Sequence, residues 1–132
     1  MVSPHYLDSS VAAHILDGRR EAAAWFEGAA GDDEVMLISS RILRLELTRF
    51  LRRDGRPLSL RDAILNQVNG VPLTERVVQR AEGIESHVKP LDAIHLASAL
   101  ETGVEPTVVT HDTRMKEVAE ILGLATFDPI AA

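Results

Sequence analysis

The sequence predicts an α/β protein, a three-layer α/β/α sandwich in which helices cover both faces of a central parallel sheet. Short apolar segments alternate with helical segments along nearly the whole chain of 132 residues. This alternation indicates a parallel sheet, because each parallel strand pair needs a long crossover connection. The chain has 45% hydrophobic residues and no repeat or linker, so we expect a single domain over residues 1–132.

Five segments are predicted to be strands, because each is a short apolar run bounded by turn or polar residues. The first, residues 5–7, ends at Asp8, and the second, residues 35–38, ends at two serines. The third, residues 70–73, contains a proline and therefore suits a sheet edge. The last two predicted strands are residues 107–110 and 124–127.

About seven helices are predicted between and after these strands from the spacing of their apolar residues. Serines after Asp8 can cap the first helix, residues 54–57 (DGRP) stop the long third helix, and Gly123 ends the last one. The predicted helices are residues 9–16, 20–30, 41–53, 59–67, 75 onward, 89–100 and 112–122.

The composition narrows the class of protein. The absence of cysteine excludes disulfides and thiolate metal sites, and it suits a reducing cytoplasm. The N-terminus does not resemble a signal peptide, and no apolar run reaches the ~20 residues of a membrane span. We therefore expect a cytoplasmic protein without a membrane partner. The net charge of −6 is unusual for a nucleic-acid binder, but seven of the twelve arginines form a basic patch between positions 41 and 61.

Two acidic residues, Asp8 and Asp112, lie where an α/β sheet binds its ligands, and a third, Asp92, lies at the start of a helix. In an open parallel sheet this place is the crevice beyond the carboxyl ends of the strands, where the strand order reverses. Asp8 ends the first predicted strand, and Asp112 lies just past the fourth. Asp92 lies in the first turn of its helix, after Pro90. Each of them alone is typical of a helix cap or a turn.

A fourth acid, Glu46, lies at the edge of an apolar helix face formed by Leu43, Leu47 and Phe50. A partly buried carboxylate needs a cation or a hydrogen bond. Carboxylates that meet in one crevice raise one another's pKa unless a divalent cation neutralises them. An all-oxygen ligand set favours Mg²⁺, with Mn²⁺ as the alternative, over zinc.

Four segments of the chain resemble the acidic motifs of the PIN-domain ribonucleases, and most of all those of the VapC toxins of bacterial toxin–antitoxin pairs. These segments are YLDSSV (6–11), RLELTRF (44–50), PLDAIHLASAL (90–100) and VVTHDTRM (108–115). The resemblance implies the strand order 3-2-1-4-5. It also implies that the four acids, Asp8, Glu46, Asp92 and Asp112, are the catalytic metal ligands. Ser9 and Thr110 match small hydroxyl positions that bind metal waters or substrate phosphate.

The function that this resemblance implies is a Mg²⁺- or Mn²⁺-dependent endoribonuclease, the toxin of a type II toxin–antitoxin pair. Such an enzyme cleaves structured cellular RNA, either transfer RNA or ribosomal RNA, by a metal-activated water and so arrests translation and growth. The products would carry a 5′-phosphate and a 3′-hydroxyl. The expected partners are the RNA, a VapB-like antitoxin and a second copy of the chain.

Two arginines and one histidine near these acids carry further expectations. Arg49 and Arg53 lie on the Glu46 side of their helix, where they could bind RNA phosphates. His95, three residues after Asp92, is expected to be a packed histidine rather than a catalytic base. Leu45 and Leu51, which lie between arginines, are expected to be exposed on a dimer or antitoxin surface.

Several alternatives share the carboxylate pattern. A PIN nuclease that processes RNA without being a toxin, and a catalytically silent PIN module that binds RNA or protein, are the main ones. A structure-specific DNA nuclease would normally need extra helical segments, for which 132 residues leave no room. A signalling receiver domain would need a lysine late in the sheet, and neither Lys89 nor Lys116 follows a predicted strand.

Overall fold

The structure is a computed structural model that describes residues 1–131, and its centre is one five-stranded sheet. The strand order is β3-β2-β1-β4-β5, and every neighbouring pair is parallel. The predicted parallel sheet and its order are therefore confirmed. The strands are β1 (Ser3–Leu7), β2 (Val35–Ser40), β3 (Asn69–Val71), β4 (Thr107–Val109) and β5 (Thr126–Phe127).

The helices follow the strands in the predicted alternation. A short 3₁₀ turn, Leu58–Arg61, precedes α4 within the segment predicted as one helix. None of the helices in the described residues has both the length and the apolar character to span a membrane. The helices are α1 (Ser9–Leu16), α2 (Arg20–Ala30), α3 (Ile42–Arg53), α4 (Asp62–Leu65), α5 (Glu75–Glu82), α6 (Pro90–Glu101) and α7 (Thr113–Ile121).

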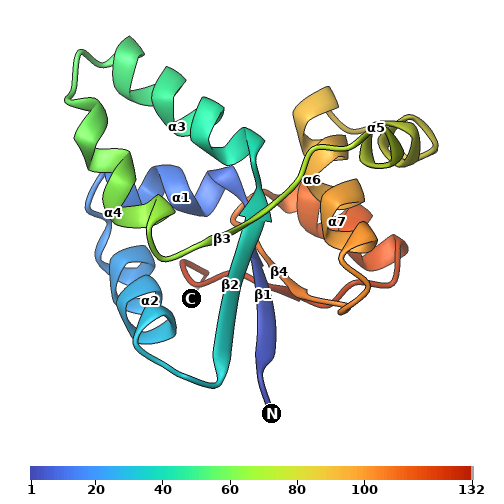
Figure 1. The fold of residues 1–132 in the computed structure, drawn as a ribbon, viewed down its shortest axis with the longest axis horizontal. Helices are drawn as coiled ribbons and strands as arrows, with labels where there is room; N and C mark the ends of the chain where they lie inside the picture. Colours follow the sequence, from blue (N-terminus) through green and yellow to red (C-terminus); the bar gives the residue numbers. More distant parts are fainter. Residues whose placement is uncertain (132) are drawn as a thin grey trace.

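Alternate residues of the strands face two separate hydrophobic clusters, as the period of two in a strand requires. Leu7 and Val109 pack with residues of α1, α2, α3 and α4 on one face of the sheet. Tyr6 and Val108 pack with residues of α6 and α7 on the other face. Figure 1 shows these two layers, with α1 and α2 on the opposite side of the strands from α6 and α7. The predicted three-layer sandwich is therefore confirmed.

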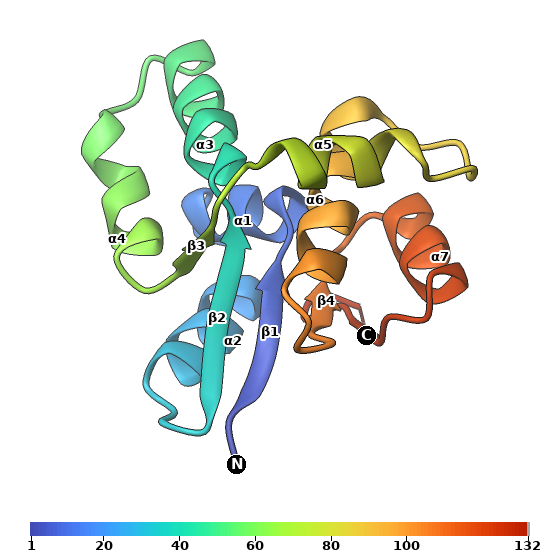
Figure 2. The same cartoon turned by 45° about the vertical axis from the view of Figure 1, so that its right-hand side comes forward.

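The strand order reverses between β1 and β4. Leu7 is paired with Val109 in their register, so Asp8 and Thr110 follow at adjacent strand ends. The backbone N–H of Asp8 continues the ladder by donating to the carbonyl of Val109 (3.0 Å). In Figure 2, α3 and α6 stand on either side of the carboxyl ends of β1 and β2. The fold thus assembles its candidate site at the switch point.

Candidate active site

A cleft of about 500 Å³ lies at the carboxyl ends of the strands, and it is lined by all four acids singled out from the sequence. We call it the acidic cleft. These acids come from four separate parts of the chain: the end of β1, the middle of α3, the first turn of α6 and the N-cap of α7. The lining residues are Asp8, Ser9, Ser10, Ala13, Glu46, Phe50, Lys89, Pro90, Leu91, Asp92 and Asp112.

Asp8 is buried at the base of this cleft and has one satisfied and one unsatisfied carboxylate oxygen. It occupies the N-cap position of α1, but its side chain makes no capping hydrogen bond. Its Oδ2 accepts hydrogen bonds from the hydroxyls of Ser10 and Thr110, both at 2.8 Å. Its Oδ1 is buried without a partner among the described residues. Since a buried unpaired oxygen is costly, Oδ1 marks a position suited to a cation.

Ser10 and Thr110 tie Asp8 to the segment that carries Asp112. The Thr110 hydroxyl accepts from the backbone N–H of Asp112 (3.1 Å), and the Ser10 hydroxyl accepts from that of His111 (3.0 Å). The Asp112 carboxylate caps α7 by accepting from the N–H of Met115 (3.0 Å). Ser9 lines the cleft but makes no side-chain hydrogen bond among the described residues. Sequence reasoning therefore missed Ser10, which stands next to Ser9 in the same motif and supports Asp8 directly.

A Thr110→Val protein tests this network. Valine keeps the shape of threonine but removes the hydroxyl that bonds Asp8 and the N–H of Asp112. We expect the free energy of unfolding to fall by about 1–3 kcal/mol, because buried polar groups lose their partner. Urea denaturation measures this change, and Thr107→Val, in the adjoining strand β4, is the matched control. A loss no larger than that of the control would contradict a role for the Thr110 hydroxyl.

The charges in the cleft act on one another. Burial, reinforced by the negative charges of Asp8 and Asp112, raises the pKa of Asp92 to about 6. The carboxylates therefore repel one another at neutral pH, and a cation bound among them would relieve this repulsion. Among residues 1–131, however, no three acidic or histidine side chains already stand as a preformed metal site. Carboxylate oxygens are still the donors that Mg²⁺ and Mn²⁺ prefer, so the residue types fit these ions.

Glu46 is buried, as its place at the edge of the apolar face predicted, but its partner was not foreseen. Its Oε1 lies 2.5 Å from Nε2 of His95, which is itself fully buried. The other ring nitrogen, Nδ1, lies 2.7 Å from the hydroxyl of Tyr6. The burial of Glu46 is thus explained by a hydrogen bond and does not by itself require a metal. His95 is packed as expected, but it also links Glu46 to the core.

Neither of the two arginines expected to bind RNA is among the residues that line the acidic cleft. Arg49 is exposed and makes no ion pair or hydrogen bond in the described part of the chain, and it does not line the acidic cleft. Arg53 pairs with Asp54 at 3.1 Å and lies over the ring of Phe50. Lys89, which the sequence reasoning passed over, does line the cleft.

One surface expectation is wrong. Leu51 is buried in the core, because it falls on the same face of α3 as Leu47, and only Leu45 is exposed.

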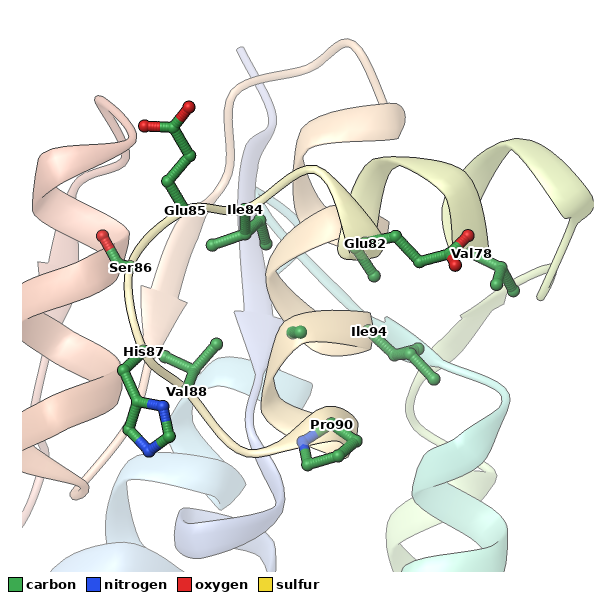
Figure 3. A pocket seen from close by; sticks show the side chains of 11 residues that line it. Val78, Glu82, Ile84, Glu85, Ser86, His87, Val88, Pro90 and Ile94 are labelled. Carbon is green, nitrogen blue, oxygen red and sulfur yellow. The ribbon is translucent and has the colours of Figure 1, made fainter.

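A second cavity, of about 520 Å³, lies between α5, the segment that follows it and α6. Figure 3 shows Ile84 and Val88 of that segment pointing inward, whereas Glu85 points away. This cavity shares Pro90 with the acidic cleft but contains none of the four acids. Its own carboxylates are those of Glu82 and Glu85, so the four acids singled out from the sequence gather in the acidic cleft alone of these two cavities.

Comparison with known proteins identifies the family. The model of the PIN domain matches residues 5–121. The chain belongs to the PIN-domain family. Among curated proteins, this PIN domain is similar to ribonuclease VapC46 of Mycobacterium tuberculosis, with 35% identity over 97 residues, 70% of this chain and 73% of the relative. It is also similar to ribonuclease VapC35 of the same organism, with 30% identity over 131 residues, 94% of this chain and 96% of the relative.

Solved structures show the same fold. A toxin–antitoxin complex from Klebsiella pneumoniae contains a chain with a TM-score of 0.73 and 22% identity, over 97% of this PIN domain and 99% of that chain. VapBC2 from Rickettsia felis, bound to a DNA fragment from its promoter, gives a TM-score of 0.75 and 12% identity, over 95% of this PIN domain and 98% of that chain. The expected resemblance to VapC-type PIN-domain ribonucleases is therefore confirmed.

Proposed function

We propose that this PIN domain is a Mg²⁺- or Mn²⁺-dependent endoribonuclease whose active site is the acidic cleft. The observation that carries the proposal is the buried Oδ1 of Asp8, which has no partner among residues 1–131 and lies in a cleft that three further carboxylates line. A bound divalent ion would supply an activated water and neutralise charge on the phosphate. The names of the relatives, ribonucleases VapC46 and VapC35, support RNA as the substrate.

The four acids and the two hydroxyl residues predicted from the sequence have proposed roles. Asp8, Asp92 and Asp112 hold the ion, in part through water, since no preformed ligand set exists among residues 1–131. Glu46 completes the ligand set or orients the attacking water through the oxygen that His95 does not bind. Thr110 keeps Asp8 in place by hydrogen bonding, and Ser9, which lines the cleft, contacts the substrate phosphate or a water of the ion.

We further propose that the enzyme is the toxin of a type II pair, acting in the cytoplasm on transfer RNA or ribosomal RNA. The complexes from Klebsiella pneumoniae and Rickettsia felis support a VapB-like antitoxin as partner. We expect a homodimer as well. The other candidates are an RNA-processing PIN nuclease and a silent binding module.

Expression in a bacterial host, with and without the product of the neighbouring upstream gene, separates these functions. The toxin should arrest growth, the upstream product should relieve the arrest, and sequencing of RNA ends should reveal discrete cuts with 5′-phosphates. Cutting without growth arrest would indicate a processing enzyme, and no cutting would indicate the binding module.

Lys89 is the proposed phosphate contact at the cleft. It is exposed and lines the cleft beside Asp92. We expect Lys89→Gln to weaken RNA binding and to lower the slope of log affinity against log salt by about 1. Binding to a labelled RNA at several salt concentrations measures the slope, and Lys116→Gln, an exposed lysine of α7, is the control. An equal change in both variants would contradict a specific role for Lys89.

Arg49→Ala and Arg53→Ala, tested in the same binding assay, decide whether the basic face of α3 also binds the RNA.

A further inference from the structure

A chain of buried hydrogen bonds runs from the sheet to the acidic cleft. The backbone N–H of Ser40, at the end of β2, donates to the hydroxyl of Tyr6 on β1 (2.9 Å). The Tyr6 hydroxyl lies 2.7 Å from Nδ1 of His95 on α6, and Nε2 of His95 lies 2.5 Å from Oε1 of Glu46 on α3. Tyr6 and His95 are both fully buried. Four elements of the fold therefore converge on one carboxylate of the cleft.

The direction of the hydrogen bond at Glu46 is fixed, because an ionised carboxylate can only accept. The Tyr6 oxygen already accepts from Ser40, and its single hydrogen is then available to Nδ1. In the neutral ring Nδ1 accepts from this hydroxyl, while Nε2 carries the ring hydrogen and donates it to Glu46. Nε2 carries a hydrogen in the doubly protonated ring as well, so the contact with Glu46 has the same direction in both states.

The consequence for Glu46 is that one of its oxygens is held and the other is not. Oε1 accepts from His95, whereas Oε2 makes no hydrogen bond within the described residues, and Glu46 lines the cleft. The position of the imidazole is itself fixed by Tyr6, whose ring lies edge-on to it with centroids 5.6 Å apart. A glutamate on α3 would otherwise have three rotatable side-chain bonds with which to leave the cleft.

We propose that His95 is a positioning residue that orients the Glu46 carboxylate toward a divalent cation in the acidic cleft. The inference rests on the proposed function, since it assumes that the cleft binds such an ion. Groups that hydrogen-bond to a metal-binding side chain set its orientation, and their loss typically weakens metal affinity by about 10- to 100-fold. Within residues 1–131 the His95 ring hydrogen-bonds only to Glu46 and Tyr6, so its effect on the ion passes through Glu46.

The test is calorimetric titration of Mn²⁺ into wild-type protein and two His95 variants. His95→Leu removes the donor and keeps much of the volume, so we expect the Kd for Mn²⁺ to rise by about 10-fold or more. His95→Gln places an amide N–H near the position of Nε2, so it should recover most of the affinity. Tyr6→Phe, which removes only the hydroxyl, should give a smaller loss. Thermal unfolding confirms that each titrated variant is folded. If His95→Leu does not fold, the loss of Mn²⁺ affinity in Tyr6→Phe tests the proposal instead.

A double-mutant cycle with Glu46→Gln identifies the route of the effect. If His95 acts through Glu46, His95→Leu should add little to the loss that Glu46→Gln already causes. Equal losses in His95→Leu and His95→Gln, or fully additive losses in the cycle, would overturn the proposal, because packing alone would then explain them. If the wild-type protein binds Mn²⁺ and His95→Leu binds it with the same affinity, only this inference is overturned. Wild-type protein that binds no Mn²⁺ would overturn the proposed function as well.

Discussion

An Asp8→Asn protein is expected to cleave RNA at least about 10³-fold more slowly than the wild type in the presence of Mg²⁺, a loss of roughly 4 kcal/mol in transition-state stabilisation. Asparagine keeps the size of aspartate and can still accept from Ser10 and Thr110, so the fold should survive. It replaces one carboxylate oxygen by an amide nitrogen and removes the charge that the proposed ion requires. Initial rates on a labelled structured RNA measure the effect.

The matched control for this variant is Asp33→Asn, an exposed acid in the loop before β2. It makes the same change of charge and chemistry away from the cleft, so its rate should equal that of the wild type. An Asp8→Asn protein with unchanged melting temperature and wild-type activity would contradict the assignment of Asp8 as a metal ligand.

Asp92→Asn should change activity and stability in opposite directions. Burial and the charges of Asp8 and Asp112 raise the pKa of Asp92 to about 6, so its ionised form is disfavoured in the metal-free fold. Neutral asparagine removes this repulsion, and we expect the metal-free protein to gain up to about 1 kcal/mol, after allowance for partial exposure to solvent. The same variant should cleave RNA about 10²-fold more slowly, because a ligand is lost.

The stability gain should depend on pH with a definite sign. The pKa of Asp92 in the fold lies above its value of about 3.9 in the unfolded chain. Asp92 therefore costs stability increasingly as the pH rises from about 4 to about 6, and the full cost is present above that range. Urea denaturation in EDTA should show Asp92→Asn as the more stable protein at pH 7.5 and equal to the wild type near pH 4. A variant less stable than the wild type at pH 7.5 would contradict mutual repulsion in the cleft.

The fold was predictable from the sequence because its signals are local. The alternation of apolar runs and helical segments identified β1, β2 and β4, which are central strands with strong apolar patterns. Asp8 and Asp112 could be placed for the same reason, since Asp8 directly follows β1 and Asp112 lies shortly after β4, and both strands end at the switch point. The boundaries were less certain at the edge strand β3, where Pro72 was included in the predicted strand but lies one residue past its end.

The polar connections of the site could not be predicted, because they join residues that are far apart in the sequence. His95 and Tyr6 are separated by 89 positions, and His95 and Glu46 by 49. The spacing of apolar residues along the chain does not predict which buried histidine hydrogen-bonds to which carboxylate. The position of Glu46 at the edge of an apolar helix face predicted that its carboxylate needs a partner, and that partner is the imidazole of His95. The helix face of Arg53 likewise predicted that it binds RNA phosphates, but it did not predict the ion pair of Arg53 with its neighbour Asp54.

The most direct test of a metal-dependent ribonuclease at the acidic cleft is RNA cleavage by the purified wild-type protein with Mn²⁺, with Mg²⁺ and with excess EDTA. The proposal predicts discrete cuts that bear 5′-phosphates in either metal, no cuts in EDTA, and recovery of cleavage when the metal is restored. Cleavage that continues undiminished in EDTA would contradict it.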